Sequence, residues 1–146
     1  TKRVIEENGG IKLFLLIMLF DYILAFTSIG LAGFAPRFCK TQVSSVVVGS
    51  LIGLFARYIC HTLSGFLFFG DYAEWFFGEQ VPWGGWFLST FHGKVLSLVY
   101  SIVYNGLYMI PEMILTAVVG GILAKALSKQ IAANRTNIAP KALRNA

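Results

Sequence analysis

Residues 43–69 read VSSVVVGSLIGLFARYICHTLSGFLFF, an apolar run of 27 residues that carries one charge, Arg57. A helix that crosses a bilayer needs about 20 predominantly apolar residues, so this run is long enough to span with some tilt. Two further runs, 11–34 and 95–127, have the same character. The sequence therefore predicts an all-α membrane protein, a helical bundle with three transmembrane helices in a single transmembrane domain over residues 1–146.

The composition supports the bilayer as solvent. Of the 146 residues, 56% are hydrophobic and 13% are charged, whereas ordinary soluble domains are about 25% charged. The net charge of +5 does not indicate nucleic acid as a partner, because Lys and Arg concentrate beside an apolar run at the end of the chain. Cys39 and Cys60 lack the spacing of a zinc site or a disulfide framework, so we interpret both as packing residues.

The connections set the expected orientation. Loop 35–42 and the tail 128–146 each carry at least two Lys or Arg residues. Segment 70–94 is acidic and aromatic, and Lys94 is its one Lys or Arg residue. Cytoplasmic segments are enriched in Lys and Arg. The sequence therefore predicts a multi-pass protein of the cell membrane, with loop 70–94 outside and the C-terminal tail in the cytoplasm.

Small residues recur along the apolar runs. Ser45, Gly49 and Gly53 follow one another at intervals of four, and Gly120 and Gly121 lie in the third run. Such residues let helix backbones approach closely in lipid. We interpret them as packing positions between helices.

Ionisable residues at membrane depth are costly and are functional candidates by default. Asp21, Arg57 and Glu112 qualify, and His61 follows Arg57 by one helical turn. At about 1.5 Å per residue, Asp21, Arg57 and His61 share the outer half of the bilayer, whereas Glu112 falls well below them. We therefore expect Glu112 to serve the backbone near Pro111 or a cytoplasmic cation.

The polar residues of this layer favour recognition over catalysis. A carboxylate attracts a cation, and the rings of Tyr22, Phe69 and Tyr104 offer faces to a flat or cationic ligand. Asn and His each present a hydrogen-bond donor and acceptor. We find no catalytic motif in the sequence and expect neither a metal nor a cofactor. The alternative is a structural membrane subunit in which Asp21 and Arg57 neutralise each other in a buried ion pair.

Three strings, in this order, resemble the ThiT family of thiamine transporters. They are LFDYILAF at 19–26 followed by GLAG at 30–33, RYICH at 57–61 followed by SG at 64–65, and YSIVYNG at 100–106. Members of this family are the substrate-binding S components of energy-coupling factor (ECF) vitamin transporters. The resemblance covers nearly the whole chain up to about residue 127.

The resemblance implies a six-helix membrane protein that binds thiamine with high affinity from outside. It also implies partners, a transmembrane coupling subunit and two cytoplasmic ATPases, so that the S component itself is not an enzyme. The chain would supply the C-terminal half, beginning just before the family's fourth helix and without its docking helix. An S component for another vitamin or a thiamine precursor stays open.

The resemblance also implies a set of substrate-binding residues. They are Asp21, Tyr22, Arg57, His61, Phe69, Tyr100 and Asn105. Phe69 stands where the family can have Trp, which would preserve stacking. Tyr100 and Asn105 are about 140° apart on an ideal helix, at about 100° per residue. Both can face one ligand only if the helix start is irregular or the ligand lies across the helix.

Overall fold

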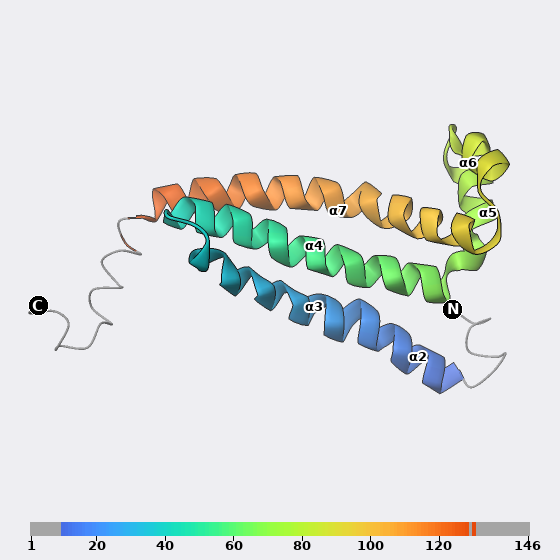
Figure 1. The fold of residues 1–146 in the computed structure, drawn as a ribbon, viewed down its shortest axis with the longest axis horizontal. Coiled ribbons are helices and arrows are strands. Elements are labelled where there is room, and N and C mark those ends of the chain that lie inside the picture. The colour runs from blue at the N-terminus through green and yellow to red at the C-terminus, as the bar shows by residue number, and fades with distance from the viewer. Residues whose placement is uncertain (1–9, 129, 131–146) are drawn as a thin grey trace, which may run out of the picture.

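A computed structural model describes residues 10–128 and 130, and the regular structure of this part of the chain is helical. Three helices are long and apolar enough to cross a membrane, and they cover 10–37, 42–68 and 93–126. They run in alternating directions along one another (Figure 1). The predicted all-α membrane bundle with three membrane helices is confirmed. The observed ends differ from the predicted ends by one to three residues.

The first membrane helix changes its winding along its length. Its four consecutive segments are α2 (Gly10–Met18), η1 (Leu19–Leu24), α3 (Ala25–Ser28) and η2 (Ile29–Arg37). The η1 segment is a stretch of π-helix, and η2 is a 3-10 helix that contains Pro36. The sequence predicted that Pro36 would end this helix at about residue 34. The helix continues to Arg37 because 3-10 geometry has a φ close to the value that the proline ring imposes.

The second membrane helix, α4 (Gln42–Phe68), lies directly against the first. A Cβ atom added to Gly49 would lie 2.9 Å from the Ala32 carbonyl oxygen, and one added to Gly53 would lie 3.0 Å from that of Ile29. These contacts are with backbone atoms, which cannot swing aside. The interpretation of Gly49 and Gly53 as close-packing positions is confirmed.

The third membrane helix, α7 (Gly93–Ala126), packs along α4. Near its end, Cβ atoms added to Gly120 and Gly121 would lie 3.3 Å and 3.1 Å from side-chain methyl groups of Val46 and Val47. The small residues of the third run therefore also lie at a helix–helix contact. Helix α4 occupies the centre of the bundle, with the first helix and α7 as its neighbours (Figure 1).

The segment between α4 and α7 forms short helices where the sequence predicted a loop over 70–94. It consists of η3 (Gly70–Tyr72), α5 (Ala73–Trp75), η4 (Phe76–Gln80) and α6 (Gly84–Thr90), gathered at one end of α7 (Figure 1). Phe76 and Phe77 are buried there together with Leu96 and Tyr100 of α7. A side chain on Gly84 would overlap the backbone carbonyl of Phe77. Aromatic burial and this close approach order the segment.

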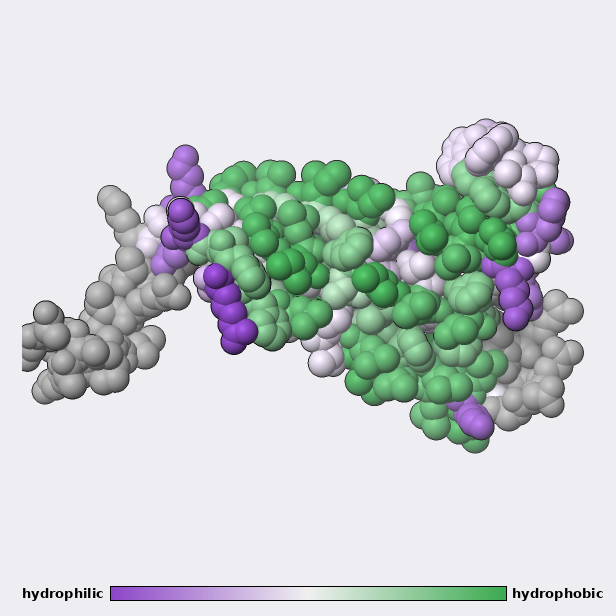
Figure 2. Space-filling model, viewed as in Figure 1, coloured by the Kyte–Doolittle hydropathy of each residue, from purple (hydrophilic) through white to green (hydrophobic). Residues whose placement is uncertain are grey.

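The face of the bundle shown in Figure 2 is mainly apolar along its length, and its most hydrophilic side chains lie toward the ends. Large side chains such as Ile114, Leu115 and Ile122 expose more than half of their area, which a bilayer would cover. Of the predicted tail 128–146, only residues 128 and 130 are described by the structure, so that prediction lies outside the described residues.

Candidate ligand-binding site

A cavity of about 540 Å³ opens between the three membrane helices. All seven residues of the predicted binding set line it. They are Asp21 and Tyr22 of η1, Arg57 and His61 of α4, Phe69 immediately after α4, and Tyr100 and Asn105 of α7. The structure thus brings the whole set into one cavity, although contact with a ligand stays a prediction.

Five further residues line the cavity outside the predicted set. They are Ile17, Phe26, Gly65, Tyr104 and Tyr108. Tyr104 and Tyr108 follow Tyr100 at intervals of four residues, and residues so spaced share one face of a helix. The sequence already indicated Tyr104 as an aromatic face of this layer, and the same spacing could have identified Tyr108.

The π-helical turn explains why Asp21 and Phe26 face the same cavity. On an ideal α-helix, residues five apart would lie about 140° from each other, at about 100° per residue. In π geometry the hydrogen bonds join residues five apart, so such positions come closer to alignment. Tyr22 and Phe26 stack with ring centroids 6.4 Å apart. The sequence alone did not reveal the wide turn, although the spacing of four residues between Tyr22 and Phe26 could have identified Phe26.

Tyr100 and Asn105 line the cavity from two flanks of α7. The helix is regular around them, so of the two expected explanations the irregular start is wrong. Counted at about 100° per residue, Tyr104 and Tyr108 fall between Tyr100 and Asn105 around the helix. The cavity therefore spreads across a broad face of α7, with tyrosine rings over most of it.

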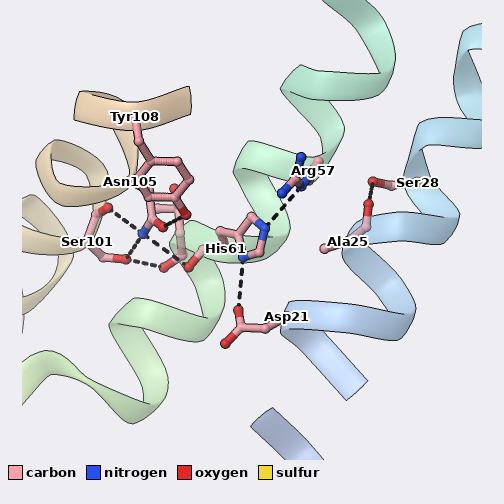
Figure 3. Close-up of polar contacts among 9 residues, drawn as sticks. Asp21, Ala25, Ser28, Arg57, His61, Ser101, Asn105 and Tyr108 are labelled. Carbon is pink, nitrogen blue, oxygen red and sulfur yellow. Dashed lines mark hydrogen bonds and ion pairs between the residues drawn. The ribbon is translucent and has the colours of Figure 1, made fainter. Parts of the chain in front are cut away.

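A network of four charged or titratable side chains, Asp21, His61, Arg57 and Glu112, crosses the bundle beside the cavity. Asp21 Oδ1 lies 3.1 Å from His61 Nδ1. Arg57 Nε lies 3.3 Å from His61 Nε2, and Arg57 Nη1 lies 2.8 Å from Glu112 Oε1. Figure 3 shows the part of this network in which the His61 ring lies between Asp21 and Arg57. The first helix, α4 and α7 are thereby linked through one imidazole and one guanidinium group.

These contacts correct two sequence-based expectations. Asp21 and Arg57 do not form the ion pair that the alternative required, because the His61 ring lies between them. Glu112 does not pair with the backbone near Pro111 or with a cytoplasmic cation, because it pairs with Arg57. The depth estimate placed Glu112 too far from Arg57 because it counted backbone rise alone, whereas an arginine carries its charge on a long flexible side chain.

The donors and acceptors of this side-chain network fit one tautomer of the neutral His61 ring. Arginine nitrogens can only donate, so His61 Nε2 accepts from Arg57 Nε and carries no proton. The proton of the neutral ring is then on Nδ1, which donates to Asp21. Two carboxylates, Asp21 and Glu112, stand against the single positive charge of Arg57. With Asp21 and Glu112 ionised and His61 neutral, this side-chain network carries one net negative charge.

Asn105 is 5% exposed and joins α7 to α4. Its Nδ2 donates to the Ser101 carbonyl oxygen at 2.8 Å and to that of His61 at 3.3 Å, while its Oδ1 accepts from the Tyr108 hydroxyl at 2.6 Å. Figure 3 shows this group on the α7 side of His61. A carbonyl oxygen has two lone pairs, so Oδ1 keeps one acceptor position. Asn105 therefore has a structural role that the sequence did not predict, in addition to its position in the cavity.

The arrangement is that of a recognition site. An uncompensated negative charge, tyrosine faces and the ring of Phe26, which lies 5.0 Å from the Arg57 guanidinium carbon, surround a cavity of small-molecule size. Among the residues that the structure describes, no group of three or more His, Cys, Asp or Glu side chains is placed to hold a metal ion. The cavity is suited to a flat cationic ligand.

Comparison with known proteins supports one family. The family model described as thiamine transporter protein (Thia_YuaJ) matches residues 5–81. The thiamine transporter ThiT of Bacillus subtilis (strain 168) is 37% identical over 112 residues, which cover 70% of this chain and 48% of the relative. The chain thus spans about half the length of this curated relative. No solved structure matches the chain significantly. The length of the family match, together with this identity, means that the chain belongs to the thiamine transporter protein family.

Proposed function

We propose that this chain is part of a thiamine-binding membrane subunit, the S component of an ECF vitamin importer. The observation that carries the proposal is the set of contacts among Asp21, His61, Arg57 and Glu112 beside the cavity. The two carboxylates and the one guanidinium group of this network leave one negative charge when His61 is neutral. Thiamine carries a permanent positive charge on its thiazolium ring. A cationic ligand would complete the charge balance of a site that is otherwise costly at membrane depth.

The remaining lining residues also suit thiamine. Its two flat rings would find aromatic faces in Phe69, Tyr100 and Tyr104. Its aminopyrimidine offers donors and acceptors, which Asp21 and the free lone pair of Asn105 Oδ1 would complement. The cavity of about 540 Å³ lies within the range of about 300–1,000 Å³ that small-molecule sites occupy. The charge, the aromatic lining and the volume of the cavity therefore support the proposal.

The competing candidates are an S component for the pyrimidine part of thiamine alone and one for another vitamin. The pyrimidine fragment is neutral and would leave the negative charge uncompensated. A structural subunit with an Asp21–Arg57 pair is not supported, because these residues have other partners. Charge selectivity is therefore the property that separates the candidates.

The proposed mechanism is capture from outside followed by reorientation in the membrane. In this proposal a transmembrane coupling subunit and two cytoplasmic ATPases supply the energy, and the S component hydrolyses nothing itself. The enrichment of cations in 35–42 and in the C-terminal part supports an outward-facing segment 70–94 and a cytoplasmic C-terminus. Uptake of thiamine by proteoliposomes should then require ATP and the coupling complex, whereas binding should require neither.

The test of the binding function uses the full-length protein in detergent and isothermal titration calorimetry. Four ligands are compared: thiamine, a neutral isostere in which carbon replaces the thiazolium nitrogen, the pyrimidine fragment, and riboflavin. We expect thiamine to bind most tightly. Tighter binding of the neutral fragment or of riboflavin, or no binding of thiamine, would overturn the proposal.

A matched pair of histidine variants locates the site. His61→Ala removes the ring that joins Asp21 to Arg57, whereas His92→Ala changes an exposed ring just before α7. We expect the first variant to weaken thiamine binding and the second to leave it unchanged. Equal affinities in both variants would show that thiamine binds elsewhere.

A further inference from the structure

Glu112 differs from the other members of the charged network because it does not line the cavity. Its side chain is 37% exposed, and its Oε1 lies 2.8 Å from Arg57 Nη1. A carboxylate within a membrane helix is costly unless it is paired. Glu112 can therefore act on a ligand only through Arg57, which does line the cavity.

The contact with Glu112 leaves Arg57 in a defined orientation. Arg57 Nη1 points to Glu112 on α7, and Arg57 Nε points to His61 on the same helix. His61 in turn donates from Nδ1 to Asp21. Without Glu112, the long Arg57 side chain would lose its carboxylate partner, and Asp21 would be the remaining carboxylate of the network.

The same contact determines the net charge. Arg57 remains positively charged under all conditions relevant here. If Glu112 were neutral, Arg57 would cancel the charge of Asp21, and the network would carry no net charge. With Glu112 ionised, one negative charge is left for a ligand, and it is carried by Asp21 in the wall of the cavity.

We propose that Glu112 is a positioning residue that makes the cavity selective for a singly charged cation, because it holds and neutralises Arg57 and so leaves Asp21 uncompensated. The inference rests on the proposed function, in which the cation is thiamine. It assigns a role in selectivity to a residue outside the cavity.

The experiment compares thiamine with its neutral isostere in the full-length protein in detergent, by calorimetry. Glu112→Gln keeps the size of the side chain and removes its charge. We expect the affinity for thiamine to fall roughly tenfold or more and that for the neutral isostere to change less than about twofold, since one charge in a partly desolvated network is removed. Glu79→Gln, at an exposed position of η4, is the matched control and should change neither affinity.

A second variant separates charge from structural support. Arg57→Gln combined with Glu112→Gln removes one charge of each sign and restores one net negative charge at Asp21. The ratio of the thiamine and isostere affinities should return towards that of the unaltered protein. Arg57→Gln alone should raise this ratio, and thermal unfolding reports whether each variant is folded.

The possible results lead to different conclusions. Equal losses for both ligands in Glu112→Gln, or a cation preference that the double variant does not restore, would overturn the role of Glu112 and leave thiamine binding intact. Failure of the unaltered protein to bind thiamine would overturn the proposed function and this inference with it. If Glu112→Gln does not fold, the ratios in the double variant and in Arg57→Gln decide the question.

Discussion

The two halves of α4 face the same neighbouring helices but make different structures with them. In the first half, Gly49 and Gly53 bring the first membrane helix into backbone contact. In the second half, Arg57 and His61 reach out to partners on both sides, and the cavity opens between the helices. The size of the side chains along one helix therefore decides where the bundle is closed and where it is hollow.

The difference between the two halves of α4 follows from how helices associate in a membrane. Lipid tails are as apolar as the helices, so helices associate through close packing of small residues and through polar contacts. The glycine half of α4 supplies the first kind of contact, and the Arg57–His61 half supplies the second. We expect changes in the glycine half to affect stability and changes in the polar half to affect ligand binding.

The largest loss of stability is expected from placing large side chains where the two helix backbones touch. Gly49→Leu combined with Gly53→Leu would force α4 away from Ala32 and Ile29. We expect a loss of stability of about 3 kcal/mol or more, because overpacking at one site already costs about 1–3 kcal/mol. Thermal unfolding in detergent measures it. Gly30→Leu is the control, since a Cβ atom there has no neighbour within 4 Å, and a loss as large in the control would contradict the close-packing argument.

The next largest effect is a loss of ligand affinity, expected from a change at Asp21, which contacts the polar half of α4. Asp21→Asn keeps the shape of the side chain and an oxygen that can accept from His61, but it removes the negative charge. We expect thiamine affinity to fall roughly 100-fold, since losing one partner of a buried charge pair costs about 2–5 kcal/mol. Calorimetry measures the affinity, and Asp71→Asn at an exposed position of η3 is the control. An unchanged affinity would mean that Asp21 does not attract the ligand.

A smaller effect is expected where packing and site meet. A Cβ atom added to Gly65 would overlap the Ser101 hydroxyl and lie 3.2 Å from Asn105 Nδ2. Gly65→Ala should therefore shift the hydrogen bonds of Asn105 and lower both stability, by about 1–3 kcal/mol, and thiamine affinity. Gly106→Ala is the control on the facing helix, because its nearest contacts would be an ordinary 3.6 Å. A loss of stability without a loss of thiamine affinity would show that Gly65 contributes to helix packing and not to ligand binding.

The smallest effect is expected from a single hydroxyl. Tyr108→Phe keeps the ring in the cavity and removes the hydrogen bond to Asn105 Oδ1, which is 2.6 Å long. We expect a loss of stability of about 0.5–1.5 kcal/mol, the usual net contribution of one hydrogen bond. Thermal unfolding compares it with Tyr104→Phe, whose hydroxyl has no hydrogen bond within the part of the chain that the structure describes. An equal loss in both variants would count against the Asn105 contact.

Most of the cavity lining could be predicted from the sequence because ionisable residues in apolar runs are conspicuous. Asp21, Arg57 and His61 were identified in this way, and the aromatic residues Tyr22, Phe69 and Tyr104 were assigned to the same layer. The resemblance also implied Tyr100 and Asn105, and all of these residues line the cavity. Tyr108 could have been assigned from its spacing with Tyr100 and Tyr104. Phe26 could have been assigned in the same way from Tyr22, whereas the π turn that brings Asp21 and Phe26 to one cavity has no clear signature in the sequence.

The sequence by itself determined that the chain crosses a membrane as helices, because apolar runs of this length leave no other way to satisfy backbone hydrogen bonds in lipid. It also indicated that Gly49, Gly53, Gly120 and Gly121 lie between helices, whereas the close contact of Gly65 with α7 emerged only from the structure. Only the tertiary structure decided which charges pair. The partners of Arg57 are His61 and Glu112 rather than Asp21, because pairing depends on side-chain reach, helix winding and the placement of one imidazole ring, and none of these follows from depth along a helix.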